Sequence, residues 1–317
     1  MPSIRKYIGN CYAYRGFGHA ALENHAKAVK DFNTAGKHMQ LDHPTVYNKL
    51  ISSGVLATQK ENYKKAMSCF TKARSIFDRA VEPLFYTALL LVIQNKNKPD
   101  KTDIYKEAKS HLDEAIRIKD SESELYYFRG LLHMYLESPV DAIPDLDSAI
   151  DKAEDNLTRH FMARGICYAL LKLYKEALQE FSIAVQIDEN CLDAYFYRGC
   201  AAYTLDDTEL ALVDFQKLIV EKPEDPHSHI HCGNLLMLTG AYEEAAKAFV
   251  NANDQCFSAE ATYQKAKCNV LIGDVATALG DLNRMLEHEQ TDGVTFDRDT
   301  LEVHKQRAKL ELITDAV

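Results

Sequence analysis

The sequence predicts an all-α protein built from repeated pairs of helices, and two observations lead to this prediction. First, Arg164-Gly165 and Arg198-Gly199 stand 34 residues apart and begin two copies of one pattern. Second, each glycine is followed by alanine after 12 residues and by phenylalanine after 16. A small residue on one helix that faces alanine and an aromatic ring on the next lets two antiparallel helices pack closely. Each copy is therefore predicted to be a helix-turn-helix unit.

The pattern extends over almost the whole chain, with alanine at the same position of eight consecutive units. Residues 1–8 are predicted to be a lead-in, and 301–314 a C-terminal helix that caps the stack, unless the chain is part of a longer array. Because an array of repeats grows by adding units, repetition and not length sets the domain count, and one continuous array is expected. The units are predicted at 9–42, 47–80, 81–122, 123–156, 158–191, 192–225, 226–258 and 259–292.

The third unit differs from the others by an insertion in its turn. Its small residue and its alanine are 20 residues apart instead of 12, which places eight extra residues near 95–102. The stretch Asn-Lys-Asn-Lys-Pro-Asp-Lys is polar and basic, so it is predicted to protrude as a loop. A solvated loop and a secondary contact for a partner both remain open.

The charge balance argues against a nucleic-acid-binding protein. The 37 basic and 47 acidic residues give a formal net charge of −10, and no basic stripe is visible. A phosphate backbone needs clustered lysine and arginine. The sequence therefore predicts no nucleic-acid partner.

The distribution of apolar residues and of cysteines indicates the cellular compartment in which the protein is expected. The N-terminus lacks the apolar run of a signal peptide, and no stretch of about 18 apolar residues suggests insertion into a membrane. Eight cysteines occur without a Cys-x-x-Cys pair, which favours reduced, structural cysteines. We expect a cytoplasmic protein in a reducing compartment, with no cofactor.

The repeated positions resemble the tetratricopeptide repeat, a two-helix unit of 34 residues with a loose Trp-x-x-Leu-Gly-x-x-Tyr, Ala-x-x-x-Phe and terminal Pro pattern. The chain has no tryptophan, and only Pro223 keeps the closing proline. The resemblance implies a right-handed superhelical solenoid whose first helices line a concave groove that holds proteins or peptides. The tryptophan site is instead occupied by Tyr12, Tyr126, Phe161, Tyr195 and His229.

The resemblance also implies which side chains of the central units point into the groove. This set has an apolar and aromatic floor with polar residues at one margin, which suits an apolar helix face or an extended segment. The alternative is that the same residues pack against neighbouring helices. The implied partner-binding residues are Tyr127, Leu131, Met134, Tyr135, Arg159, Met162, Ile166, Leu170, Asp193, Phe196, Tyr203, His227, Ile230 and Asn234.

Four arginines recur at one repeat position: Arg15, Arg129, Arg164 and Arg198. They are predicted to pair with acids on an adjacent helix rather than to recognise an anion, because arginine stems also pack well on apolar surface. The acids expected as partners include Asp145, Asp147 and Glu180.

One motif suggests a metal site, since in His227-x-His229-x-His231-Cys232 the first and third histidines lie one helical turn apart. Zinc needs three or four ligands, and no others are evident nearby, so no metal is predicted.

The carboxylate clamp of co-chaperones is matched only by isolated residues, Asn234 and Lys267. A chaperone adaptor is therefore the less favoured adaptor function.

Enzyme signatures are missing from the sequence, which has no phosphate-binding Gly-x-x-x-x-Gly-Lys loop, no His-Glu-x-x-His and no Gly-x-Ser-x-Gly. The first hypothesis is a non-catalytic scaffold or adaptor that binds a peptide or helical segment of a partner in the groove. The second is a self-associating structural subunit, a homo-oligomer that packs through its terminal helices. An enzyme with an unrecognised site is the third.

Overall fold

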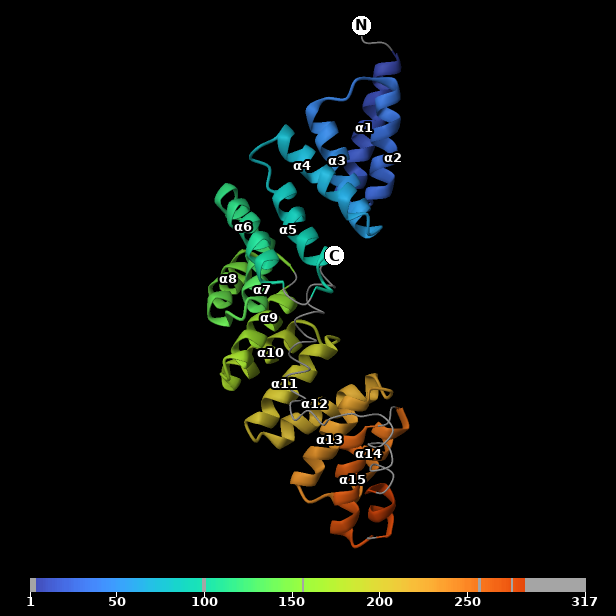
Figure 1. Ribbon diagram of the computed structural model, residues 1–317, viewed down its shortest axis with the longest axis vertical. Coiled ribbons are helices and arrows are strands. Elements are labelled where there is room, and N and C mark those ends of the chain that lie inside the picture. The colour runs from blue at the N-terminus through green and yellow to red at the C-terminus, as the bar shows by residue number, and fades with distance from the viewer. Residues whose placement is uncertain (1–3, 99–100, 156, 256–257, 275, 283–317) are drawn as a thin grey trace. The chain divides into compact units, whose positions relative to one another are not determined.

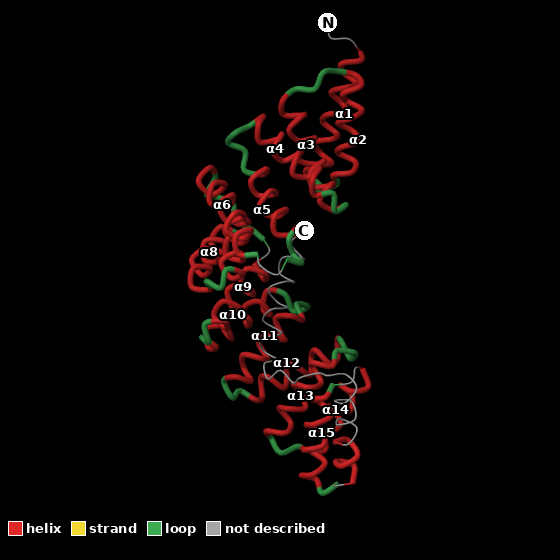
Figure 2. The backbone as a smooth tube through the Cα atoms, viewed as in Figure 1, coloured by secondary structure: helices red, strands yellow, loops and turns green. Residues whose placement is uncertain are grey.

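The computed structural model describes residues 4–98, 101–155, 157–255, 258–274 and 276–282. All regular elements in these residues are helices, and none is a strand (Figure 2). The all-α prediction is confirmed. The helices are α1 Ile4–Ala21, α2 His25–His38, α3 His43–Gln59, α4 Tyr63–Ile76, α5 Glu82–Gln94, α6 Thr102–Ile118, α7 Ser123–Tyr135, α8 Pro139–Lys152, α9 Leu157–Leu170, α10 Tyr174–Ile187, α11 Leu192–Thr204, α12 Thr208–Glu221, α13 Pro226–Leu238, α14 Tyr242–Gln255 and α15 Ala259–Ile272.

Two compact units divide the described residues, one ending at Ala153 and the other beginning at Glu154. Within each unit a helix packs mainly on the helices just before and just after it in sequence, as α1 with α2 and α13 with α14 (Figure 1). Such neighbour-only packing is typical of a repeat protein. We call each antiparallel pair, from α1/α2 to α13/α14, a hairpin. The repeat boundaries inferred from the sequence stay a prediction, and the expected capping helix 301–314 lies outside the described residues.

None of the helices in the described ranges is long and apolar enough to cross a membrane.

Most hairpin turns contain one residue in the left-handed region of backbone space. At Gly240 and Gly273 that residue is glycine, which adopts a positive φ without steric cost. In five other turns it is a larger residue, whose Cβ makes this conformation unfavourable by about 1–2 kcal/mol. Glycine therefore marks only two of these turns in the sequence. The five non-glycine residues are Glu23, Glu61, Glu137, Lys172 and Asp206.

In most hairpins the small residue is matched in size to the large residue that it faces, whereas in the fourth Gly130 faces Leu146. A Cβ on Gly165 would lie 2.6 Å from Cε1 of Phe181, and the glycines facing Phe32, Phe70 and Phe249 are similarly close, while a Cβ on Gly199 would lie 3.1 Å from Cζ of Phe215. Where the sequence has alanine at this position, at Ala88 and Ala266, the residue at the phenylalanine position is leucine. A phenyl ring thus fits only where its neighbour has no side chain.

The predicted arginine pairs exist, and they follow one geometric rule. Each arginine binds with two nitrogens the acid 16 residues further on, in the second helix of its own hairpin. The pairs are Arg15 with Asp31, Arg129 with Asp145, Arg164 with Glu180 and Arg198 with Asp214, at nitrogen–oxygen distances of 2.6–3.0 Å. The expected partners Asp145 and Glu180 are confirmed, whereas Asp31 and Asp214 were not foreseen.

The aromatic site of the repeat lies beside these arginines. The guanidinium carbons of Arg15 and Arg198 are 5.1 and 5.2 Å from the ring centres of Tyr12 and Tyr195. A cation over an aromatic face is attracted by the ring quadrupole. Each ring therefore holds its arginine in position for the acid. Arg129 and Arg164 lie in the same way on Tyr126 and Phe161.

Candidate functional site

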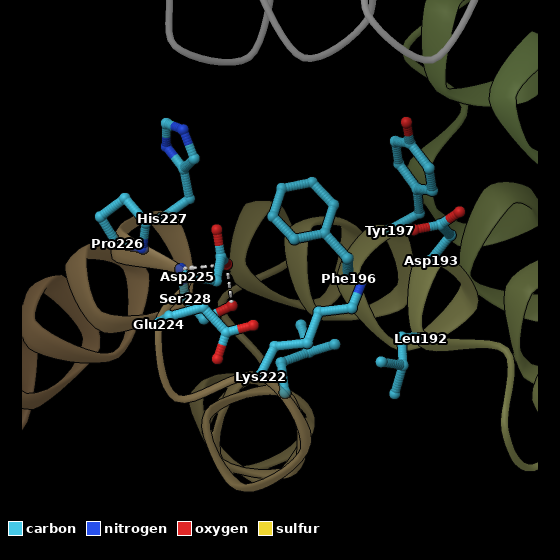
Figure 3. Close-up of a pocket in the computed structure, with 11 residues that line it drawn as sticks. Leu192, Asp193, Phe196, Tyr197, Lys222, Glu224, Asp225, Pro226, His227 and Ser228 are labelled. Atoms are coloured by element: carbon cyan, nitrogen blue, oxygen red, sulfur yellow. Dashed lines mark hydrogen bonds between the residues drawn. The ribbon is translucent and has the colours of Figure 1, made fainter. Parts of the chain in front are cut away.

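The candidate site is a cavity of about 320 Å³ in the second unit (Figure 3). One wall comes from α11, a second from the turn that joins α12 to α13, and a third from the first turn of α13. Its lining residues are Leu192, Asp193, Phe196, Tyr197, Leu218, Lys222, Glu224, Asp225, Pro226, His227 and Ser228. This volume is at the lower end of the range typical of binding pockets.

The turn before α13 is fixed by its own side chains. Asp225 caps the helix, because its Oδ2 accepts hydrogen bonds from the Ser228 backbone N–H at 3.0 Å and from the Ser228 hydroxyl at 2.5 Å. Pro226 takes the first helical position, where its missing N–H costs nothing. Behind it, His229 Nε2 donates to the Pro223 carbonyl oxygen at 2.9 Å. This wall of the cavity is therefore well ordered before any ligand arrives.

The rim of the cavity is predominantly acidic. Burial alone would raise the pKa of Asp225, but the hydrogen bonds from Ser228 outweigh burial and hold the pKa below its ordinary value. Asp225 is thus charged at neutral pH. Asp193 and Glu224 are exposed at the same rim, and Lys222 offsets part of their charge.

Phe196 forms the apolar centre of the cavity. Its ring meets Phe215 and His231 edge-on, at centroid distances of 6.1 and 5.7 Å, and those two rings stack on each other at 4.9 Å. Phe215 is fully buried, whereas Phe196 is half-buried. In Figure 3 the Phe196 ring lies between the side chains of His227 and Tyr197. Phe196 is therefore a partly buried ring at the cavity that neighbouring aromatic side chains support.

The site offers aromatic and acidic side chains, which suit the binding of a ligand. The Ser228 hydroxyl donates a hydrogen bond to the Asp225 carboxylate. A nucleophilic serine would instead donate this bond to a base such as histidine. Within the described ranges no three histidine, cysteine or acidic side chains are grouped so that they could hold a metal ion. The histidine motif of α13 is divided between three environments: His227 at the cavity, His229 on the Pro223 carbonyl, and His231 on Phe215.

The structure brings together three of the residues that the sequence assigned to partner binding. Asp193, Phe196 and His227 line the cavity. On the same two helices Tyr203 is 41% exposed, Asn234 is half-buried and Ile230 is buried, and none of these lines it.

The other assigned residues lie on α7 and α9. On α7, Tyr127, Leu131 and Met134 are buried, and the Tyr135 ring is half-buried at 5.1 Å from the ring of Tyr105. Burial raises the pKa of Tyr135 well above its ordinary value. On α9, Met162 and Ile166 are buried, whereas Arg159 and Leu170 are half-buried. The five buried side chains of this set are thus less accessible to a partner than Phe196.

Several cavity residues were missed by the sequence reasoning. Lys222, Glu224 and Asp225 lie at the end of the predicted unit 192–225, where only Pro223 was interpreted, as the closing proline of the repeat. The capping pattern Asp225-Pro226-x-Ser228 was the available signal, because it marks an ordered helix start beside the first helix of the preceding unit. Tyr197 follows Phe196 directly and gave no signal of its own.

Comparison with known proteins confirms the fold. No protein-family model matches the chain. Its structure resembles MamA from Desulfovibrio magneticus, with 20% identity, 54% of this chain and 97% of that chain covered, and a TM-score of 0.52. It also resembles a tetratricopeptide repeat protein from Parabacteroides merdae, with 16% identity, 86% and 99% coverage, and a TM-score of 0.51. The predicted resemblance is confirmed: the chain has the tetratricopeptide repeat fold.

One curated relative shares part of the sequence. The mitochondrial import receptor subunit TOM70 of Homo sapiens is 30% identical over 105 residues, which are 32% of this chain and 17% of that protein. The match therefore spans less than a fifth of the relative's length.

Proposed function

We propose that this protein is a non-catalytic interaction scaffold that binds a peptide or helical segment of a partner protein, with the cavity between α11 and α13 as its central contact. The observation that carries the proposal is Phe196, a half-exposed ring that Phe215 and His231 support from behind. A ring held in this way buries a large area on binding and loses little side-chain entropy.

Two further observations support a binding role. The cavity opens between the first helices of two consecutive hairpins, and its acidic rim can orient a partner that fills the apolar centre. The human relative is by its name a receptor subunit, which is the same class of function. We assign no reaction to the site.

We expect a photo-crosslinking residue at the cavity to capture a defined partner in the cells that contain this protein. The residue p-benzoylphenylalanine would replace His227 at the cavity or, as a control, Val213, which is 56% exposed on α12 and does not line it. A discrete crosslinked protein is expected from position 227 and not from position 213. Equal crosslinking from both positions would show that the cavity is not the contact.

A second substitution tests the ring itself. Phe196→Ala in the position-227 crosslinker should lower the crosslinked yield about tenfold, the effect of losing a central aromatic contact worth roughly 1.4 kcal/mol. Phe196→Leu keeps most of the apolar volume and should lower it less. Circular dichroism of both variants checks that helical content is kept. Undiminished crosslinking of a folded Phe196→Ala variant would contradict the proposal.

A second candidate function, self-association through the first helix, is favoured by the exposed face of α1. Tyr7 and Tyr14 on this helix are 58% and 74% exposed. A hollow of about 410 Å³ is lined by Tyr7, Ile8, Cys11, Tyr12 and Arg15. The same face of a second copy could cover it in a two-fold symmetric contact.

Light scattering over a range of concentrations tests this candidate. A wild-type mass that rises toward a dimer, and a monomer for Tyr7→Ser with Ile8→Ser, are expected if α1 mediates the contact. Leu22→Ser, an equally polar change at an exposed residue in the following turn, should leave the dimer intact. A wild-type monomer at every concentration would exclude this candidate.

A further inference from the structure

Charge is distributed very unevenly along this chain. Residues 4–76 contain twelve of the 37 lysine and arginine residues but only four of the 47 aspartate and glutamate residues, so this segment carries +8 although the whole chain carries −10. The remaining residues therefore carry −18. The first two hairpins, α1/α2 and α3/α4, are therefore basic, although the net charge of the whole chain is negative.

The lysines of α4 lie on its outer face. Lys64, Lys65 and Lys72 are exposed, and α4 contains no aspartate or glutamate. On α2, Lys27, Lys30 and Lys37 are likewise exposed, while the only acid of that helix, Asp31, is buried against Arg15. The basic surface thus has little acidic compensation from its own helices.

The position of two of these lysines is unfavourable for the stability of the helix. Lys64 and Lys65 belong to the first turn of α4, where the exposed backbone N–H groups carry partial positive charge. A cation there opposes the helix dipole by about 0.3–1 kcal/mol, whereas an acid would be favourable. Helix stability therefore does not account for these two lysines.

A hollow of about 500 Å³ lies beside Lys64 and Lys72. It is lined by Tyr63, Lys64, Met67, Ser68, Thr71, Lys72 and Gln94. Gln94 ends α5 and leads into the basic loop of the third hairpin, where the Asn95 side-chain Nδ2 donates to the Leu91 carbonyl at 2.7 Å. Exposed Lys96 and Lys98 follow directly. Lysines from two elements therefore lie near one partly apolar depression.

We propose that this surface, defined by Lys64, Lys72 and the hollow that they line, binds an acidic segment of a partner protein that carries an apolar side chain between its carboxylates. The apolar side chain would enter the hollow over Met67 and Tyr63, and the carboxylates would pair with the lysines. The surface lies in the first unit and the cavity of Phe196 in the second, so this proposal does not depend on the function proposed above.

The chemistry of the surface favours a protein segment over a membrane or a nucleic acid. A helix that binds a lipid surface needs large apolar residues among its lysines. The outer face of α4 instead has Ser68, Thr71 and Ser75. Phosphate recognition favours the fork of arginine, but Arg74 of this helix is paired with Glu114 at 2.5 Å.

Fluorescence anisotropy of the full chain tests the proposal. The probe is a short fluorescein-labelled synthetic peptide of aspartate and glutamate with one leucine at its centre. We expect saturable binding that weakens with added salt, and weaker binding of a peptide with serine in place of leucine. Lys64→Glu with Lys72→Glu should raise the Kd about tenfold or more, because two attractions become repulsions.

The matched control reverses two exposed lysines elsewhere, Lys175→Glu with Lys247→Glu, and changes the net charge by the same amount. It should leave the Kd within about twofold, because neither lysine lines the hollow and both belong to the second unit. Lys64→Glu places an acid in the first turn of α4, where it favours the helix, so unfolding would not explain a loss of binding.

Three results would overturn the proposal. The first is equal loss of binding in both charge-reversed variants, and the second is no binding of the leucine peptide by the wild type. The third is tighter, Lys64-dependent binding of phosphatidylserine vesicles or single-stranded RNA than of the peptide.

Discussion

Replacing Asp214 by alanine is expected to lower the free energy of unfolding of the second unit by about 3–5 kcal/mol. The Asp214 carboxylate is 0% exposed and accepts hydrogen bonds from Arg198 Nε at 2.9 Å and Nη2 at 2.6 Å. The substitution removes the only acid shown to bind this guanidinium, which is itself mostly buried. A buried charge without its partner accounts for the size of the effect.

The pKa shifts of the two groups explain why breaking the pair lowers the stability of the fold strongly, although the intact pair adds little to that stability. The hydrogen bond to Asp214 raises the pKa of Arg198, so the guanidinium stays charged. Burial raises the pKa of Asp214 above its ordinary value although Arg198 acts in the opposite direction. Taking the carboxylate out of water therefore cancels much of what the pair gains.

The chain contains the control for this experiment. The next hairpin has Cys232 and Ala248 at the corresponding positions and packs without an ion pair. The double change Arg198→Cys with Asp214→Ala should therefore be less destabilising than Asp214→Ala alone. Urea unfolding followed by far-UV circular dichroism measures both. A double variant as unstable as the single one would contradict this explanation.

Gly165→Ala is expected to destabilise the second unit by about 1–2 kcal/mol, although alanine favours helices by roughly 1 kcal/mol over glycine. The new Cβ would lie 2.6 Å from Cε1 of Phe181, which is itself fully buried and cannot move freely. Overpacking in a dense interior exceeds the gain in helix propensity. Thermal unfolding measured by circular dichroism gives the size and sign.

Two further variants separate overpacking from other causes. Gly18→Ala on α1 meets nothing within 4 Å and should stabilise the protein by up to about 1 kcal/mol. Gly165→Ala with Phe181→Leu recreates the alanine and leucine of the third hairpin, Ala88 and Leu112. It should be less destabilised than the sum of its single changes. If the loss of stability of the double variant equals the sum of the two single losses, Gly165 and the Phe181 ring are not coupled.

The candidate site was only partly predictable. Asp193, Phe196 and His227 were identified because the repeat register places them on first helices. Lys222 and Asp225 were not, because at the end of the predicted unit 192–225 only Pro223 matches the repeat pattern. The basic surface of α4 was missed for a different reason: the net charge of −10 sums a segment of +8 with a much longer acidic remainder.

The sequence by itself determined the helical hairpins and their internal packing. Small and large residues recur at fixed offsets within each unit, so the contact of Gly165 with Phe181 and the pairing of Arg164 with Glu180 depend on residues 16 apart on two consecutive helices. Such contacts are local, and repetition makes their pattern visible in one sequence.

Only the tertiary structure decided which aromatic side chains remain open. Tyr127 and Phe196 were assigned to the same groove, yet Tyr127 is buried and Phe196 is half-exposed at a cavity. Exposure depends on what the neighbouring hairpin and its connection place beside the ring. Around Phe196 these are His231 of α13 and the capped turn at Asp225. His231 and Ser228, which holds Asp225 in its capping position, lie in the repeat after the one that contains the ring, so the pattern within one repeat could not reveal this arrangement.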